Sequence, residues 1–170
     1  MRSRNIQGRE GGSMRKLKVY LDTTIISYLF ADDTPSQRDD TLLLWEHLKK
    51  GKCDIYLSVN TLGEILDCDE PKRSKMLAKL KEIEYTTIDN NDEIKALSNA
   101  YIKNDVLKQK SIVDSLHVAC AVISNCDMLL SWNFRHLANP KTEDGVKYVN
   151  SMNNYIGIRI IPPSMLIHTL

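Results

Sequence analysis

The chain has 170 residues, of which 42% are hydrophobic and 26% are charged, and its formal net charge is +1. This composition is ordinary for a globular protein, and the length favours one domain with a substantial hydrophobic core. The small net charge excludes a global field that attracts polyanions, so any affinity for nucleic acid must come from local patches.

The cysteine spacing and the hydropathy pattern bear on where the protein works. The four cysteines lie far apart without a Cys-x-x-Cys pair, and the sequence shows neither a signal peptide nor an apolar run of membrane-spanning length. We therefore expect a reduced, cytoplasmic protein that does not enter a membrane. The sequence also contains no Gly-x-Gly-x-x-Gly motif and no P-loop.

The first thirteen residues differ from the rest of the chain. They contain three glycines and several charges without a periodic apolar pattern, which predicts a disordered leader over 1–13. The remainder, 14–170, is interrupted by no Pro/Gly/Ser-rich linker and no internal repeat. We predict one domain over 14–170.

Along the first half of this domain, short apolar runs alternate with amphipathic segments. The pattern predicts, in order, a strand over 18–21, a short helix around 25–29, a helix around 42–48 that Gly51 ends, a strand over 54–59, and helices over 62–66 and 71–83. The helix before Gly51 is predicted from one broad apolar face formed by Leu42, Leu43, Trp45 and Leu48.

The second half continues in the same way. The predicted elements are a strand over 85–88, helices over 92–104 and 112–124, strands over 128–131 and 156–161, and a short last helix opened by Pro162-Pro163. The two tryptophans, Trp45 and Trp132, are expected in the core. Such alternation of strands and helices predicts a parallel sheet with helices on both sides.

Three acidic residues follow apolar runs: Asp22 after Val19–Leu21, Glu64 after Ile55–Val59, and Asp114 after Ser111–Val113. Ends of such runs gather at one edge of a parallel sheet, which is the usual place for a ligand crevice. Carboxylates gathered there repel one another unless a cation lies between them. Hard oxygen ligands without a matching His or Cys framework favour Mg²⁺ or Mn²⁺ over zinc.

Each acid also has a simpler interpretation as a helix cap. Asp22 before Thr23-Thr24 fits an N-cap, and both Thr61 to Glu64 and Ser111 to Asp114 fit a capping box or its aspartate variant. Taken singly, capping is the commoner role for such residues. Three acids at three element ends shift the balance towards a shared site.

Four segments carry a resemblance to a known family. Leu21–Ile26, Ser58–Ile65, Asp114–Ala119 and Cys126–Leu137 occur in the order and spacing of PIN-domain proteins, whose best-known members are the VapC-type toxins of toxin-antitoxin pairs. The chain resembles this family from about Leu17 to Leu166. The resemblance implies a three-layer α/β/α fold with a mainly parallel central sheet.

The resemblance also implies a set of site residues. Asp22, Glu64 and Asp114 match the three core acids of the family, and Asn133 falls on a fourth position that is often Asp. All four are therefore expected as metal ligands, with Asn133 the weakest because its side chain is neutral. Ser131 matches a Thr or Ser that orients a water or the acids. Asp127 precedes the strand over 128–131 and is expected at the far end of the sheet.

The implied activity is that of a metal-dependent endoribonuclease, a hydrolase of RNA phosphodiester bonds. One or two Mg²⁺ or Mn²⁺ ions would polarise the scissile phosphate and activate a water for in-line attack. The resemblance implies products with 5′-phosphate and 3′-hydroxyl ends. It further implies that the protein is the toxin of a type II pair, with a cognate antitoxin as partner and a homodimeric assembly.

Several basic residues are candidates for contact with RNA. Arg135 and His136 lie beside the strand over 128–131, and His117 lies one helical turn after Asp114. An ordinary solvated turn explains Arg135 and His136 equally well, and a packed histidine is the commoner interpretation of His117. A second basic stripe around the helix over 71–83 reads first as a solvated face and second as an RNA-binding face: Lys72, Arg73, Lys75, Lys79 and Lys81.

Two other functions stay open at this point. The chain could be a PIN scaffold with weakened catalysis that binds RNA or protein, for which Asn133 is the sequence hint. It could also be a phosphatase-like enzyme with Asp22 as nucleophile, but the second Asp that such enzymes carry two residues later is Thr24 here.

Overall fold

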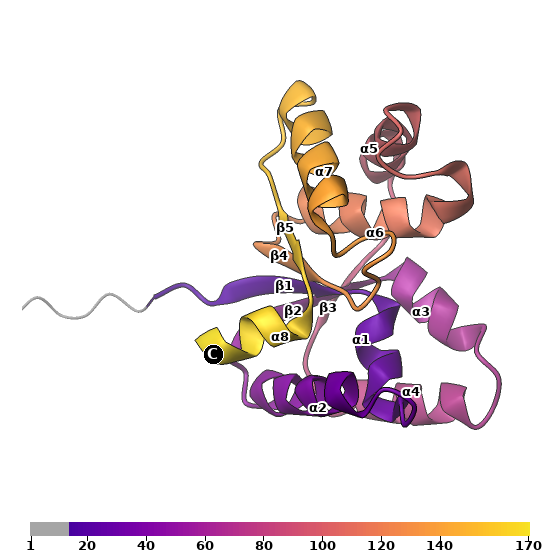
Figure 1. Ribbon diagram of the computed structural model, residues 1–170, viewed down its shortest axis with the longest axis vertical. Helices are drawn as coiled ribbons and strands as arrows, with labels where there is room; N and C mark the ends of the chain where they lie inside the picture. Colours follow the sequence, from indigo (N-terminus) through magenta and orange to yellow (C-terminus); the bar gives the residue numbers. More distant parts are fainter. Residues whose placement is uncertain (1–13) are drawn as a thin grey trace, which may run out of the picture.

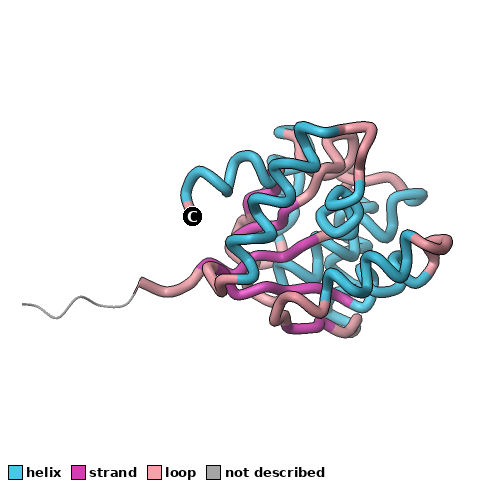
Figure 2. The backbone as a smooth tube through the Cα atoms, turned by 90° about the horizontal axis from the view of Figure 1, so that it is seen from below, coloured by secondary structure: helices cyan, strands magenta, loops and turns pink. Residues whose placement is uncertain are grey.

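The computed structural model describes residues 14–170, and the expectation of a disordered leader lies outside the described residues. Five strands form one parallel sheet in the order β3-β2-β1-β4-β5, and they run side by side between the helices (Figure 2). The strands are β1 Leu17–Leu21, β2 Cys53–Ser58, β3 Thr86–Ile88, β4 Met128–Leu130 and β5 Arg159–Ile161. All four strand pairs are parallel, as the alternation of elements predicts.

The central strand β1 explains why both faces of the sheet are buried. Val19 lies opposite Ile55 of β2 and Met128 of β4, and all three belong to one hydrophobic cluster. Tyr20 points to the other face, where it joins a second cluster with Leu129. Because successive side chains alternate between the faces of a strand, an unbroken apolar run fits a strand that is covered on both sides.

Two groups of helices cover the two faces, and Figure 1 shows them on opposite sides of the sheet. On the face of Val19 and Leu21, the covering helices are α1 Thr23–Ser27, α2 Pro35–Lys49, α4 Lys72–Leu80 and α8 Pro163–Leu166. On the face of Tyr20, they are α5 Asp92–Lys103, α6 Ile112–Ile123 and α7 Pro140–Met152. Helix α3, Val59–Leu66, contacts both α1 and α6. The predicted three-layer α/β/α architecture is confirmed.

Short 3₁₀ turns extend or precede three of the helices. They are Tyr28–Phe30 after α1, Gln109–Ser111 before α6 and Ile167–Thr169 after α8. The turn over 109–111 matters for the site, because it sets where α6 begins.

Three details differ from the sequence-based expectations. Helix α7 was not among the predicted elements, although Asn139 caps it through the backbone N–H of Thr142 at 2.9 Å and Pro140 opens it. Leu42 and Leu43 are 40% and 49% exposed, so the buried face of α2 is shifted to Thr41, Leu44, Trp45 and Leu48. Helix α3 begins at Val59, directly at the end of β2, rather than at 62.

The core tryptophans and the cysteines behave as expected. Trp45 and Trp132 are 1% and 5% exposed. The four cysteine thiols are all free, and burial raises the pKa of Cys120 to about 11 and of Cys126 to about 12. Neither of these buried thiols is therefore primed as a nucleophile.

Within residues 14–170, none of the helices combines the length and the apolar character needed to cross a membrane.

Candidate functional site

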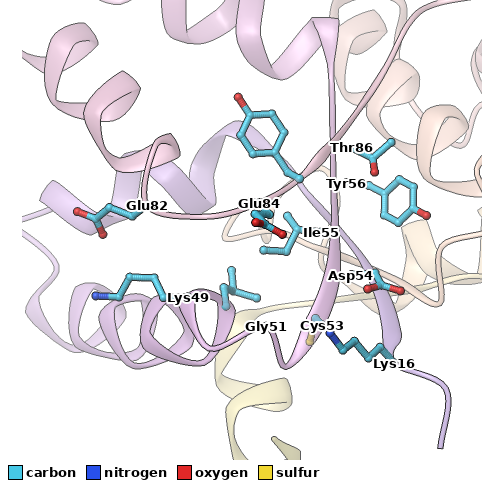
Figure 3. Close-up of a pocket in the computed structure, with 12 residues that line it drawn as sticks. Lys16, Lys49, Gly51, Cys53, Asp54, Ile55, Tyr56, Glu82, Glu84 and Thr86 are labelled. Atoms are coloured by element: carbon cyan, nitrogen blue, oxygen red, sulfur yellow. The ribbon is translucent and has the colours of Figure 1, made fainter. Parts of the chain in front are cut away.

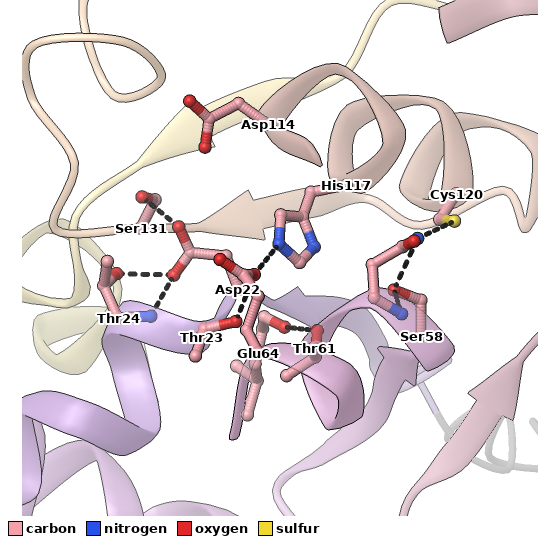
Figure 4. A network of polar contacts seen from close by, with 12 residues as sticks. Asp22, Thr23, Thr24, Ser58, Thr61, Glu64, Asp114, His117, Cys120 and Ser131 are labelled. Atoms are coloured by element: carbon pink, nitrogen blue, oxygen red, sulfur yellow. Dashed lines mark hydrogen bonds and ion pairs between the residues drawn. The ribbon is translucent and has the colours of Figure 1, made fainter. Parts of the chain in front are cut away.

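The carboxyl ends of the parallel strands meet at one edge of the sheet, and the predicted acids lie around it. Asp22 directly follows β1 and Ser131 directly follows β4. Glu64 lies on α3, which leaves the end of β2, and Asp114 lies in the first turn of α6. Figure 4 shows these side chains arriving from four separate elements. The topology thus delivers the predicted carboxylates to one region.

Asp22 is the most deeply buried of the three acids, at 3% exposure. One carboxylate oxygen, Oδ1, accepts hydrogen bonds from the backbone N–H and the hydroxyl of Thr24, at 2.9 and 2.5 Å. The other, Oδ2, accepts from the hydroxyl of Ser131. Asp22 is therefore the N-cap of α1, as the simpler interpretation predicted, and it is also tied to the end of β4 by Ser131.

The charge of Asp22 is only partly compensated by these neighbours. Burial raises the pKa of the Asp22 carboxyl, and the opposing effects of the nearby His117 and of the hydrogen bonds from Ser131 and Thr24 do not cancel that rise. Within residues 14–170, no Lys, Arg or His forms an ion pair with Asp22. A cation beside this carboxylate would supply the missing compensation.

Glu64 has a different environment, because its side chain is 43% exposed. Its Oε1 accepts hydrogen bonds from the Thr23 hydroxyl at 2.6 Å and from Nε2 of His117 at 2.7 Å. Burial alone raises the pKa of Glu64, but the hydrogen bonds from His117 and Thr23 outweigh it, and the pKa lies below its ordinary value. Glu64 is thus held as a carboxylate.

A buried chain of hydrogen bonds stands behind Glu64. A carboxylate only accepts, so His117 donates through Nε2–H, and in the neutral imidazole Nδ1 is then an acceptor. The Tyr20 hydroxyl, 2.7 Å from Nδ1, donates to it, and the Tyr20 oxygen accepts from the Ser58 hydroxyl at 2.6 Å. Ser58 in turn accepts from the backbone N–H of Asn60 at 3.2 Å. In this tautomer, every donor in the series of hydrogen bonds points towards Glu64.

The burial of His117 in this series of hydrogen bonds corrects the expectation that it contacts RNA. The His117 side chain is 2% exposed and both ring nitrogens are used inside the protein. Its hydrogen bond to Oε1 holds the Glu64 carboxylate in place. The spacing of His117 from Asp114 placed it on the site-facing side of α6, but the partners Tyr20 and Ser58 come from distant strands and leave no local signal in the sequence.

Asp114 is held by a histidine as well. Its Oδ2 lies 3.1 Å from Nδ1 of His136, and the backbone N–H of His136 donates to Oδ1 of Asn133 at 3.0 Å. The backbone N–H of Asn133 donates to the Ser131 hydroxyl oxygen at 2.9 Å. Asn133 therefore closes the turn after β4, and among residues 14–170 its side chain makes no hydrogen bond to an acidic side chain. Figure 4 draws Asp114 apart from Asp22 and Glu64.

The capping-box interpretation of Glu64 and Asp114 is wrong. The N-cap of α3 is Ser58, so Thr61 and Glu64 lie inside the helix. Ser111 occupies the N-cap position of α6 but makes no side-chain capping bond. Neither Glu64 nor Asp114 is needed to start its helix, which leaves both carboxylates available for another role.

The donor set of this site suits a hard divalent cation. Its ligands would be carboxylate oxygens, which Mg²⁺ and Mn²⁺ prefer. Across the described part of the chain, however, no three His, Cys, Asp or Glu side chains converge closely enough to hold an ion by themselves. The acids line the edge without closing on a common point. Mg²⁺ usually keeps several waters and binds through only one or two carboxylates together with substrate phosphate, so an open arrangement fits it.

Asp127 lies at the opposite end of the sheet, as its position before β4 predicts. Its carboxylate receives two hydrogen bonds from the Arg15 guanidinium, at 2.8 and 3.1 Å, and one from the backbone N–H of Lys18 at 2.7 Å. These partners hold the amino-terminal arm of β1 against β4. Asp127 is a structural acid and takes no part in the site.

Two hollows on the surface differ in their relation to the predicted site residues. One of about 530 Å³ lies at the amino ends of β1 and β2, where Lys16 and Lys49 mix with Asp54, Glu82 and Glu84 (Figure 3). It contains none of the predicted site residues. A smaller one of about 170 Å³ includes Arg135 and His136 and adjoins Asp114. The smaller hollow is the one relevant to the acids, because His136 in its lining contacts Asp114.

The chain matches no protein-family model and no curated protein sequence. Among solved structures, it is similar to a chain in the crystal structure of VapBC2 from Rickettsia felis bound to a DNA fragment from their promoter. The TM-score is 0.53 and the sequence identity is 15%, over 86% of this chain and 98% of that chain. At this level of identity the likeness concerns the fold. The protein therefore has a PIN-like α/β fold with a parallel central sheet.

Proposed function

We propose that this protein is a metal-dependent endoribonuclease that hydrolyses RNA phosphodiester bonds. The observation that carries the proposal is the buried carboxylate of Asp22, which lacks an ion-pair partner among residues 14–170 and lies at the same sheet edge as Glu64 and Asp114. Open parallel α/β sheets bind ligands at this edge. The proposed ligands are Asp22, Glu64 and Asp114, with Mg²⁺ or Mn²⁺ as the ion.

The surrounding residues prepare the acids for this task. When bound, the ion would lower the pKa of a water and stabilise charge on the phosphate. Ser131 and Thr24 fix both oxygens of Asp22, so its carboxylate cannot rotate freely. His117 fixes Glu64 and His136 fixes Asp114. Such preorganisation would hold the ion where the phosphate develops negative charge, without a conformational cost during the reaction.

The same chemistry disfavours the phosphatase alternative. Thr24 donates its hydroxyl hydrogen to Asp22 and accepts from the backbone N–H of Trp132 at 2.9 Å. Thr24 thus has a structural role at the position where such phosphatases carry a second acid. Asp22 is also held among three donors, which makes it a poor nucleophile.

The proposed biological setting is a toxin-antitoxin pair in the cytoplasm. Support comes from the PIN-like fold and from the similarity to a chain of the VapBC2 structure, which contains promoter DNA. A cognate antitoxin that covers the acidic site and a homodimeric toxin are part of this proposal. Co-expression with the neighbouring open reading frame, followed by copurification, tests the partner directly.

The decisive experiment is a metal titration of RNA cleavage. The full chain is treated with EDTA and then supplied with Mg²⁺ or Mn²⁺ and a labelled single-stranded RNA. We expect metal-dependent cleavage that is lost in Asp22→Asn and retained in Asp127→Asn, which removes an equivalent charge at the other end of the sheet. Thermal melts verify that both variants are folded. Equal cleavage by the parent and Asp22→Asn would contradict the proposal.

A second candidate function rests on Asn133. The position that is often Asp in the family contributes no charge here, because asparagine is neutral, and its side-chain oxygen accepts the backbone N–H of His136. A scaffold with weakened catalysis that binds RNA or protein is the corresponding alternative. RNA binding by a well-folded parent chain without cleavage at any Mg²⁺ or Mn²⁺ concentration would favour it.

A further inference from the structure

A basic pocket lies beside the acidic site. It has a volume of about 170 Å³ and is formed by three segments: the loop and 3₁₀ turn before α6, the turn after β4, and the start of α7. We call it the basic pocket and define it by its four cationic side chains, Lys108, Lys110, Arg135 and Lys141. All four are exposed. Segments that are far apart in the sequence thus bring positive charge to one place.

These charges are poorly neutralised by the protein. Lys108 pairs with Asp105 at 3.4 Å, but both side chains are largely exposed and the pair is weak. Among residues 14–170, Lys110, Arg135 and Lys141 form no ion pair. In a chain with a net charge of +1, such a cluster is a local departure from the average. It is the kind of local patch that a nearly neutral nucleic-acid-binding protein requires.

His136 joins this pocket to the acids. It lines the pocket, and its Nδ1 lies 3.1 Å from Oδ2 of Asp114. Ser111, which also lines the pocket, lies 3.5 Å from the same nitrogen through its hydroxyl. A ligand in the pocket would therefore lie next to Asp114, and an extended polyanion could occupy the pocket and the acidic edge together.

We propose that the basic pocket binds a backbone phosphate of single-stranded RNA and thereby sets which phosphate lies over the acids. The inference rests on the proposed ribonuclease function and names the surface that holds its substrate. Phosphate contacts fix the register of a bound strand but carry no base information. The pocket therefore positions RNA without selecting its sequence.

The basic stripe on α4 is the competing surface. Arg73 and Lys79 are engaged there with Glu70 and Glu82, both at 3.0 Å. The remaining stripe residues, Lys72, Lys75 and Lys81, are exposed and form no ion pair within the described chain. Helix α4 packs on the face of the sheet opposite α5, α6 and α7. We assign the RNA contact to the basic pocket because it shares His136 with the acidic site.

The two surfaces provide a matched pair of variants. One carries Lys110→Ala, Arg135→Ala and Lys141→Ala, and the other carries Lys72→Ala, Lys75→Ala and Lys81→Ala. Each removes three exposed positive charges that form no ion pair among residues 14–170, so the net charge falls equally. Binding of a fluorescein-labelled single-stranded RNA is measured by fluorescence anisotropy in EDTA, where no metal-dependent cleavage occurs, at several salt concentrations.

We expect the pocket variant to bind RNA at least about tenfold more weakly than the parent at low salt, and the α4 variant to bind almost as tightly as the parent. The slope of log affinity against log salt becomes shallower by about 0.7 for each phosphate contact that the pocket variant loses. Equal losses in both variants, or a larger loss in the α4 variant, would overturn the proposal. So would binding of labelled oligoglutamate at the pocket without binding of RNA, which indicates an acidic protein segment instead.

The outcome is independent of catalysis. If Asp22→Asn retains cleavage, the proposed active site fails while the anisotropy result still decides the pocket. If the pocket variant loses RNA affinity but keeps the parent's Mn²⁺ affinity in calorimetry, the pocket acts on the RNA and not on the ion.

Discussion

The two ends of the sheet treat an aspartate in opposite ways. Asp127, just before β4, receives a guanidinium and a backbone N–H, and these partners, led by the Arg15 hydrogen bond, hold its pKa below the ordinary value. Asp22, just after β1, is buried among hydroxyls and an amide, and burial raises its pKa. Folding thus pairs the carboxylate of Asp127 at the amino ends of the strands with a cation. It leaves the carboxylate of Asp22, at their carboxyl ends, without one among residues 14–170.

Under the proposed function, this difference separates a structural acid, Asp127, from an acid that binds an ion, Asp22. A carboxylate with its own cation gains little from a metal, because the new ion must displace the old partner. A buried carboxylate with only neutral donors gains much more, since burial weakens screening.

The largest expected effect is on metal affinity. Asp22→Asn, Glu64→Gln and Asp114→Asn should each weaken Mn²⁺ binding by more than the roughly 10–100-fold loss that is typical for residues that only support a ligand. Isothermal titration calorimetry measures this, with Asp127→Asn as the control at the other end of the sheet. Unchanged binding in all three variants would remove the metal site from this edge.

The next effect concerns His117, which supports Glu64 without being a proposed ligand. His117→Ala should weaken Mn²⁺ binding about 10–100-fold, while His117→Gln, which keeps an N–H donor, should recover part of the loss. Ser115→Ala is the matched control, because it also removes a buried hydrogen bond of α6, to Ser98, away from Glu64. If the alanine and glutamine variants bind Mn²⁺ equally, the histidine acts through packing alone.

The contrast between the two aspartates also predicts opposite effects of pH on stability in EDTA. The folded pKa of Asp22 is raised, so the folded state binds a proton that the unfolded state has lost, and the parent loses stability as pH rises through that pKa. The folded pKa of Asp127 is lowered, so its contribution is present above the unfolded pKa and is lost as pH falls through the folded value.

Chemical denaturation at a series of pH values tests this pair of signs. Asp22→Asn should flatten the fall in unfolding free energy as pH rises above the ordinary aspartate pKa, and Asp127→Asn should flatten the fall as pH drops below it. Two variants that alter the curve in the same direction would show that Asp22 is not strained by burial.

The smallest effect is expected at Asn133. Because the Asn133 side-chain oxygen accepts the backbone N–H of His136, an aspartate can close the same turn. Asn133→Asp should therefore leave the metal concentration for half-maximal RNA cleavage nearly unchanged. A clear decrease would instead return Asn133 to the group of metal ligands.

The fold could largely be predicted from the sequence, for a physical reason. Strands that are buried on both faces are continuous apolar runs, and Val19–Leu21 of β1 and all of β4 stand out in this way against the amphipathic helices, whereas β2 carries the exposed Asp54. Helix α7 was missed although Asn139-Pro140 is a start signal. The helix is polar on much of its surface, with only Thr142, Val146, Val149 and Asn150 buried.

The site could be predicted only in part. The acids Asp22, Glu64 and Asp114 follow from their places after apolar runs and from a family resemblance. The contacts that support these acids could not be predicted, because Tyr20, Ser58 and His117 meet only after three distant segments have folded. The exposed Leu42 and Leu43 show the same limit, since an apolar pattern marks a broad helical face and tertiary packing decides which part of it is buried.

The central position of β1 has a consequence for how the acids move. Asp22 continues a strand that is hydrogen-bonded on both sides, and its own N–H donates to the carbonyl oxygen of Leu130 at 3.3 Å. Its amide and those of Val19–Leu21 should exchange with solvent deuterium only when the whole sheet opens. Asp114 lies instead in the first turn of α6, where a smaller opening suffices. The sheet edge thus combines a carboxylate that the central strand anchors with one, Asp114, that can move with the start of α6.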